Sequence, residues 1–164
     1  MIIRREHPGD AAAISALVEA AFLDAPHTSH TEHLIVDALR QAGALSVSLV
    51  AKEGSELIGH VAVSPVAISD SSTGWYGLGP IAVLPSHQQQ GIGSRLMEAA
   101  IGELRSIGAA GCVLLGDPAF YTRFGFRPDP DLILEGVPPA YFLSLPLQSR
   151  RARGTVTYHP AFSL

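Results

Sequence analysis

The sequence predicts a single α+β (α/β) domain spanning residues 1–164, with a mixed, mostly antiparallel central sheet and flanking helices. Three observations support this prediction. A chain of 164 residues is long enough for one domain with a substantial hydrophobic core. Residues 45–83 alternate between apolar and polar positions and are interrupted by short polar turns, as in an antiparallel meander. Residues 78–115 read as strand, glycine turn, amphipathic helix and strand, an order that places the two strands parallel.

The N-terminal part is predicted to contain one short strand and two helices. The strand is Ile2–Arg5, and Asp10 is a suitable N-cap for the helix that follows it. The second helix shows a capping-box pattern, with Ser29 as N-cap and Glu32 three residues later, and it ends at Gly43.

Three histidines, His27, His30 and His33, precede and enter this second helix and raise the question of a metal site. On a helix the first and third would diverge by about a third of a turn, and no cysteine accompanies them. The capping-box interpretation is therefore favoured and no metal is predicted. The segment before the helix remains a candidate wall of a substrate pocket.

The meander that follows is predicted to contain three strands. Leu45–Lys52 and Leu57–Ile68 pair through a turn at Glu53–Glu56, and the third strand begins at Trp75. Pro80 lies within this third strand, and proline marks an edge or a bulge because it has no N–H to donate. A bulge would splay this strand from its parallel neighbour. The pair should then open at its carboxyl ends, where α/β sheets tend to bind ligands.

The most informative stretch is the glycine turn between the strand 78–84 and the helix 92–107. The first N–H groups of a helix have no partner inside the helix, and the helix dipole favours an anion there. Gly91 and Gly93 have no side chains, so a bulky phosphate can approach the backbone closely. The turn is therefore predicted to bind a pyrophosphate through main-chain amides. The alternative is a tight strand-to-helix connection that binds nothing.

In this context Gln88-x-x-Gly91-x-Gly93, preceded by Ile81–Val83, resembles the acetyl-CoA-binding motif of the GNAT superfamily of N-acetyltransferases. The spacing differs from the dinucleotide fingerprint Gly-x-Gly-x-x-Gly, and the chain contains no P-loop Gly-Lys-Ser/Thr. The resemblance implies that acetyl-CoA is the co-substrate, with its pyrophosphate on the turn and its pantetheine arm in the splayed strand pair. The residues to which it assigns acetyl-CoA binding are Ile81, Ala82, Val83, Gln88, Gln89, Gln90, Gly91, Ile92, Gly93 and Ser94.

A second similarity lies after the strand Gly111–Leu115, where Asp117 and Pro118 are predicted to start a short helix. The GNAT superfamily commonly places a Tyr three residues before a Gly-Phe-like turn, and here Tyr121 precedes Phe124-Gly125-Phe126. The resemblance implies that Tyr121 protonates the leaving thiolate of coenzyme A. Three segments are similar to the YhbS-type branch of the superfamily: Leu78–Pro85, Phe120–Phe126 and Tyr158–Phe162.

Two features common in the superfamily are missing. Many members carry a basic Glu on the strand before the phosphate turn, but residues 75–84 contain no acidic residue. Many carry an Asn at the end of the next strand, but residues 113–117 contain none. The general base therefore stays open, with three candidates: Glu32, His33 and Asp117.

The predicted function is transfer of an acetyl group from acetyl-CoA to an amine of an unidentified small molecule or peptide. The transfer is direct, without a covalent enzyme intermediate, and the amide of Val83 is the expected donor to the developing oxyanion. The alternative is a non-catalytic acyl-CoA-binding sensor or regulatory module, which requires the turn but not Tyr121. A nucleotide-binding oxidoreductase is disfavoured by the glycine spacing.

Composition limits the partners and the compartment. The formal net charge is −4, and the only basic cluster is residues 150–153, so we expect no nucleic-acid partner. Cys112 is the single cysteine, which predicts a small buried hydrophobe, no internal disulfide and a cytoplasmic protein. The N-terminus has no apolar signal core and no stretch is long enough to span a membrane. Two late strands, 141–147 and 154–158, are of the kind that often contributes to dimers in this superfamily, so we expect a homodimer.

Overall fold

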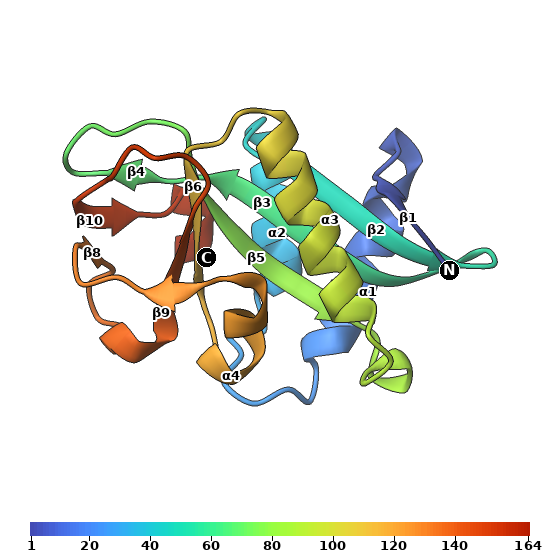
Figure 1. Ribbon diagram of the computed structural model, residues 1–164. Coiled ribbons are helices and arrows are strands. Elements are labelled where there is room, and N and C mark those ends of the chain that lie inside the picture. Colours follow the sequence, from blue (N-terminus) through green and yellow to red (C-terminus); the bar gives the residue numbers. More distant parts are fainter.

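A computed structural model describes residues 1–164 and shows a large twisted sheet with helices on both faces (Figure 1). The helices are α1 (Ala11–Phe22), α2 (Glu32–Gln41), α3 (Ile92–Ser106) and the single-turn α4 (Pro118–Tyr121). In sheet order, the seven strands are β1 (Ile2–Arg5), β2 (Val47–Glu53), β3 (Glu56–Pro65), β5 (Trp75–Val83), β6 (Gly111–Leu115), β9 (Phe142–Pro146) and β7 (Arg127–Pro128). A small second sheet contains β4 (Ala67–Ile68), β10 (Gly154–Thr157) and β8 (Leu132–Ile133). All neighbouring strands of the large sheet are antiparallel except β5 and β6, so the predicted fold class is confirmed.

The two faces of the large sheet bury separate hydrophobic clusters. Helix α3 lies across one face and buries an apolar stripe at helical spacing: Ile92, Leu96, Met97, Ala100 and Leu104. Helices α1 and α2 cover the opposite face, where Ile14, Val18 and Val36 pack against the side chain of Ala82 from β5. The sheet is thus held between α3 and the α1–α2 pair (Figure 1). None of the helices has the length and apolar character needed to cross a membrane.

The parallel pair β5–β6 is short and opens toward its carboxyl ends. Its pairing covers only Trp75–Gly77 against Gly111–Val113. Beyond Gly77, β5 pairs only with β3, while β6 continues beside β9. The β3–β5 register shifts because the three-residue step from Leu78 to Ile81 on β5 lies opposite a two-residue step on β3. This confirms the bulge predicted at Pro80 and the splay predicted from it.

One predicted strand is divided in the structure. Leu57–Ile68 was expected to be continuous, but β3 ends at Pro65 and β4 joins the second sheet by pairing with β10. Pro65 has no N–H for a ladder, which favours a strand end at this position. The amide of Val66 instead donates to the carbonyl of Trp75 at 3.1 Å.

The predicted helix caps are partly confirmed. Asp117 caps α4, because its Oδ1 accepts a hydrogen bond from the Ala119 amide at 2.9 Å. Asp10 occupies the N-cap position of α1, as predicted, but its carboxylate makes no capping hydrogen bond to that helix; it accepts the His7 amide and closes a 3-10 turn before the helix. The prediction that Ser29 is the N-cap of α2 is wrong. The helix begins at Glu32, because Thr31 has a non-helical backbone with φ of −114°.

Candidate active site

The glycine turn and the N-terminus of α3 border a hollow of about 470 Å³. It contains seven of the ten residues predicted to bind acetyl-CoA: Val83, Gln88, Gln89, Gly91, Ile92, Gly93 and Ser94. His87, Phe120 and Arg123 complete the lining. The structure therefore brings the end of β5, the turn and α4 together around one concave surface.

The turn presents backbone rather than side chains to this hollow. Gly91 precedes α3 with φ of +80°, a left-handed conformation in which a side chain would be strained. At Gly93 a side chain would meet only the Phe120 ring, 3.8 Å from an added Cβ. The amides at the start of α3 have no carbonyl partner within the helix, so they remain available to an anion.

Two side chains give this hollow its shape and charge. Gln88 Nε2 donates a hydrogen bond to the carbonyl of Val83 at 3.1 Å, which ties the turn to the end of β5. Arg123 stacks on the Phe120 ring, with its guanidinium carbon 4.8 Å from the ring centroid. Arg123 thus places a cation at the hollow of the glycine turn. Gln90, also predicted to bind the cofactor, is exposed and lines neither this hollow nor the cavity described below.

The backbone of β5 alternates between its two neighbours. The Leu84 amide donates to the carbonyl of Ile58 on β3 at 2.9 Å. Successive strand residues direct their polar groups to opposite edges, so Ala82 also faces β3, whereas Ile81 and Val83 face the open side of the splay. Ala82 was expected to expose its backbone to the cofactor together with its neighbours. In the structure its side chain lies under α1 and its backbone edge belongs to the β3–β5 ladder.

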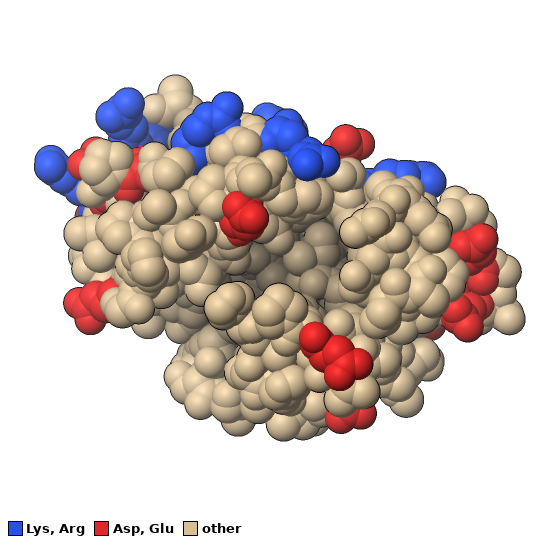
Figure 2. All heavy atoms as spheres, turned by 90° about the horizontal axis from the view of Figure 1, so that it is seen from below, with Lys and Arg blue, Asp and Glu red and all other residues tan.

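A second cavity of about 740 Å³ lies at the opening of the splay. Its lining comes from segments that are far apart in the sequence: Phe22, Ser29, Glu32, Ile35, Leu78, Gly79, Pro80, Ile81, Leu115, Tyr121, Leu134, Glu135, Val137, Tyr158, Phe162 and Ser163. Figure 2 shows this face of the molecule, with a central hollow lined mainly by uncharged atoms. Ile81 and Tyr121 therefore belong to this cavity, next to the hollow of the glycine turn.

Tyr121 is held by close packing. Its ring lies against Gly116, where an added Cβ would come within 3 Å of two ring atoms, and it contacts Phe120 edge-on at a centroid distance of 4.9 Å. Burial raises the pKa of the Tyr121 hydroxyl above its ordinary value. The side chain is therefore a phenol at neutral pH and is able to donate a proton.

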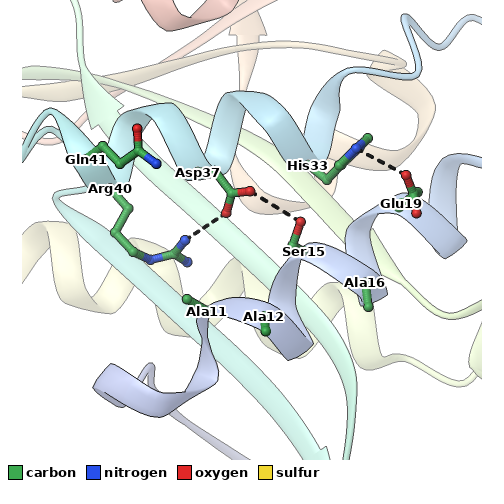
Figure 3. A pocket seen from close by; sticks show the side chains of 9 residues that line it. All are labelled: Ala11, Ala12, Ser15, Ala16, Glu19, His33, Asp37, Arg40 and Gln41. Atoms are coloured by element: carbon green, nitrogen blue, oxygen red, sulfur yellow. Dashed lines mark hydrogen bonds and ion pairs between the residues drawn. The ribbon is translucent and has the colours of Figure 1, made fainter.

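Only one of the three candidate bases lines the cavity of Tyr121. Glu32 does so. His33 instead lies in a groove between α1 and α2, where its Nε2 is 3.2 Å from a carboxylate oxygen of Glu19 (Figure 3). Asp117 caps α4 and does not line the cavity.

The polar groups of the groove in Figure 3 are paired with one another: Ser15 donates to Asp37 at 3.3 Å and Arg40 to Asp37 at 3.0 Å. No group of three or more His, Cys, Asp or Glu side chains in the chain has an arrangement that could hold a metal ion. Cys112 is fully buried in the main core, as predicted, and burial raises the pKa of its thiol.

A family model described as an acetyltransferase (GNAT) domain matches residues 44–128, just over half of the chain. The protein belongs to the GNAT acetyltransferase family. This match confirms the superfamily predicted from the glycine turn, and it includes both the turn and Tyr121.

Individual relatives agree with this GNAT assignment. The chain is 39% identical over 128 residues to an uncharacterized N-acetyltransferase, YhbS, of Escherichia coli, which covers 77% of this chain and 74% of that protein. It superimposes on the crystal structure of E. coli YhbS in complex with CoA with a TM-score of 0.90, at 34% identity, covering 99% of this chain and 92% of that one. A GNAT family acetyltransferase of Brucella melitensis, solved with acetyl-CoA, has a TM-score of 0.88 at 46% identity, covering 98% and 97% of the two chains. The YhbS-like branch, the fold and the N-acetyltransferase class are thereby confirmed.

Several residues of the site were not predicted from the sequence to be site residues. Arg123 lies two residues after Tyr121, and its position on the same short segment as the predicted acid was the one indication that it belongs to the site. Glu135, Tyr158 and Phe162 reach the cavity through loops and the C-terminal segment. No local pattern predicts such a contact, because it depends on the tertiary fold.

Proposed function

We propose that this GNAT protein transfers the acetyl group of acetyl-CoA directly to a primary amine held in the cavity beside Tyr121. The observation that carries the proposal is the junction of two concave surfaces at one splayed strand pair. One contains backbone amides and an arginine, and the other contains the half-buried phenol of Tyr121. The bound structures of the E. coli and B. melitensis relatives support acetyl-CoA as the co-substrate.

The turn and Arg123 would bind the anionic end of acetyl-CoA. The free amides at the start of α3, including that of Gly93, would donate to the pyrophosphate, and Arg123 would add a charge-assisted contact. The pantetheine arm would then lie along the open edge of β5. There it would find the exposed backbone groups of Ile81 and Val83, in the manner of an added strand.

The chemical step would take place in the larger cavity. After the ammonium has lost one proton to solvent, the amine nitrogen forms a bond to the thioester carbonyl carbon, the carbon–sulfur bond breaks, and the thiolate takes the proton of Tyr121. The second proton that the nitrogen loses restores the Tyr121 hydroxyl. Overall, an ammonium and acetyl-CoA give the acetamide, CoA with a free thiol, and one proton. We propose the amide of Ile81, in place of Val83, as the oxyanion donor, because Ile81 shares the cavity with Tyr121 and Val83 does not.

The proposal extends to the setting of the enzyme. We propose a cytoplasmic protein, for which the single, buried Cys112 thiol is suited to a reducing compartment. A homodimer is proposed from the late strands, as in related folds. Static light scattering should give twice the mass of one chain, and the mass of a single chain at working concentration would contradict it.

The direct test is amine-dependent release of CoA thiol, measured together with calorimetric binding of acetyl-CoA and, as a control, NADH. We expect acetyl-CoA to bind, NADH not to bind, and thiol release to depend on added amine. Binding of acetyl-CoA without thiol release for any amine would favour the sensor alternative. No binding of acetyl-CoA would overturn the proposed function.

A further inference from the structure

The cavity beside Tyr121 combines apolar walls with negative charge. Ten of its sixteen lining residues are hydrophobic, and its only charged members are Glu32 and Glu135. No Lys, Arg or His lines it. The neighbouring hollow at the glycine turn has the opposite character, since its ionisable side chains are His87 and Arg123. The two hollows therefore favour ligands of opposite charge.

A second, independent observation is the incomplete hydrogen bonding of the Glu32 carboxylate. One carboxylate oxygen, Oε2, accepts hydrogen bonds from Thr28 Oγ1 at 2.6 Å and from the Ser29 amide at 3.1 Å. The other oxygen, Oε1, is buried and has no hydrogen-bond partner in the chain. A buried acceptor without a partner is costly to the folded state, and a bound donor would relieve that cost.

The charge state of Glu32 follows from the same contacts. Burial acts to raise the pKa of Glu32, but the hydrogen bonds from Thr28 and Ser29 outweigh burial and hold it below its ordinary value. Glu32 is therefore a carboxylate at neutral pH. A carboxylate with one oxygen lacking a partner, at the wall of an apolar cavity, is suited to a cationic N–H donor.

The face shown in Figure 2 agrees with this separation of charge. Acidic side chains border the uncharged hollow, while basic side chains gather along one edge of the face. An anionic cofactor and a cationic acceptor would thus approach from differently charged sides.

We infer that the acceptor is a primary amine carried on an apolar body, such as an arylalkyl or alkyl ammonium, and that Glu32 binds the ammonium group. Phe22, Ile35, Pro80 and Phe162 provide the apolar surface for the body, and Glu135 adds a second carboxylate at the exposed side of the cavity. This inference rests on the proposed function, since it names the substrate class of the same site.

The test uses equilibrium binding, so that it does not depend on turnover. The CoA-loaded protein is titrated by calorimetry with four ligands: 2-phenylethylamine, 2-phenylethanol, ethanolamine and phenylalanine. The alcohol removes the positive charge, ethanolamine removes the apolar body, and phenylalanine adds a carboxylate. We expect 2-phenylethylamine to bind at least about tenfold more tightly than each of the other three.

Three variants test whether the preference for the amine over the alcohol arises from the carboxylates of the cavity. Glu32→Gln should abolish the preference for the amine over the alcohol while leaving CoA affinity unchanged. Glu135→Gln should reduce the preference and leaves the contacts of Thr28 and Ser29 intact, so it serves as a second variant if Glu32→Gln is unstable. Glu98→Gln, at an exposed position on α3 outside the cavity, should retain the full preference.

The outcomes distinguish failure of the proposed substrate class from failure of the proposed acetyltransferase function. Equal binding of amine and alcohol, no binding of any of the four ligands, or an unchanged preference in both cavity variants would overturn the substrate class alone. Failure of CoA itself to bind would overturn the proposed function and, with it, this inference.

Discussion

Tyr121 is the residue on which the proposed chemistry depends most directly. It is a half-buried phenol, fixed against Gly116 and Phe120, and it lines the same cavity as Ile81 of β5. These contacts restrict the ring to one orientation, which is what a proton donor to a leaving thiolate requires. Its raised pKa keeps the proton in place across the neutral range.

Replacing Tyr121 by Phe removes the hydroxyl and retains the ring packing. We expect kcat for amine acetylation to fall by about 100-fold to 10,000-fold, the usual contribution of a positioned acid. The affinity for acetyl-CoA should stay the same, because the ring remains in place. Steady-state kinetics over a range of pH, together with calorimetric titration, would check both. An unchanged kcat at every pH would rule out Tyr121 as the acid.

At the scale of single elements, the turn before α3 provides the phosphate-binding surface. The backbone conformation at Gly91 and the open space at Gly93 leave the main-chain amides at the start of α3 accessible from the hollow, which the Arg123 guanidinium also lines. Gly93 lies in α3, and a side chain there would project toward Phe120 without a clash. A substitution at Gly93 can therefore change acetyl-CoA binding without destabilising the fold.

Gly93→Asp should weaken acetyl-CoA binding by about tenfold or more, because its carboxylate would repel the pyrophosphate. The thermal stability should not fall, since an acidic residue in the first turn of α3 is favourable to the helix dipole. Gly102→Asp, at an exposed position in the same helix where an added Cβ meets no atom within 4 Å, is the matched control. Equal acetyl-CoA affinities for the two variants would contradict the assignment of the turn.

The elements also show which parts of the site were readable in the sequence. The glycine turn is a contiguous stretch, so its resemblance to the GNAT motif, together with the preceding strand, predicted seven of the residues around the first hollow. The start of α2 was predicted too early, because Ser29 and Glu32 have the spacing of a capping box. The Glu32 carboxylate does accept the Ser29 amide, but Ser29 lies before the helix, which begins only at Glu32. For the acceptor cavity, the segment before α2 was predicted as a candidate wall, and Ser29 of that segment does line the cavity. The contributions of Phe22, Glu135 and Phe162 could not be predicted, because these residues meet only when α1, the loop after β8 and the C-terminus are packed together.

At the scale of the whole molecule, a buried polar cluster under the α1–α2 face links pH to stability. His60 on β3 is fully buried; its Nε2 contacts Ser48 Oγ at 2.8 Å, and its Nδ1 has no partner. Burial lowers the pKa of His60 from 6.5 to about 4, against the opposing charge of Glu6, while Arg40 adds a smaller lowering effect. His60 is therefore neutral in the folded protein at neutral pH.

The sign of the pH dependence follows from this shift. Between pH 6.5 and about pH 4 the unfolded chain binds a proton at residue 60 and the folded chain does not, so the free energy of unfolding falls as the pH decreases. The contribution reaches up to about 1.4 kcal/mol per pH unit within this window. Urea unfolding of the wild type and of His60→Gln at pH 7 and pH 4.5 measures it. The variant should lose less stability than the wild type on acidification, and an equal loss would refute the assignment.

The central claim is that one acetyl-CoA molecule spans both hollows, with its pyrophosphate at the glycine turn and its thioester beside Tyr121. A crystal structure of the protein with acetyl-CoA tests this most directly. We expect phosphate oxygens about 3 Å from the amides at the start of α3, including that of Gly93, and the thioester sulfur within hydrogen-bond reach of the Tyr121 hydroxyl. An acetyl-CoA molecule bound in the α1–α2 groove, or with its sulfur outside the cavity of Tyr121, would contradict it.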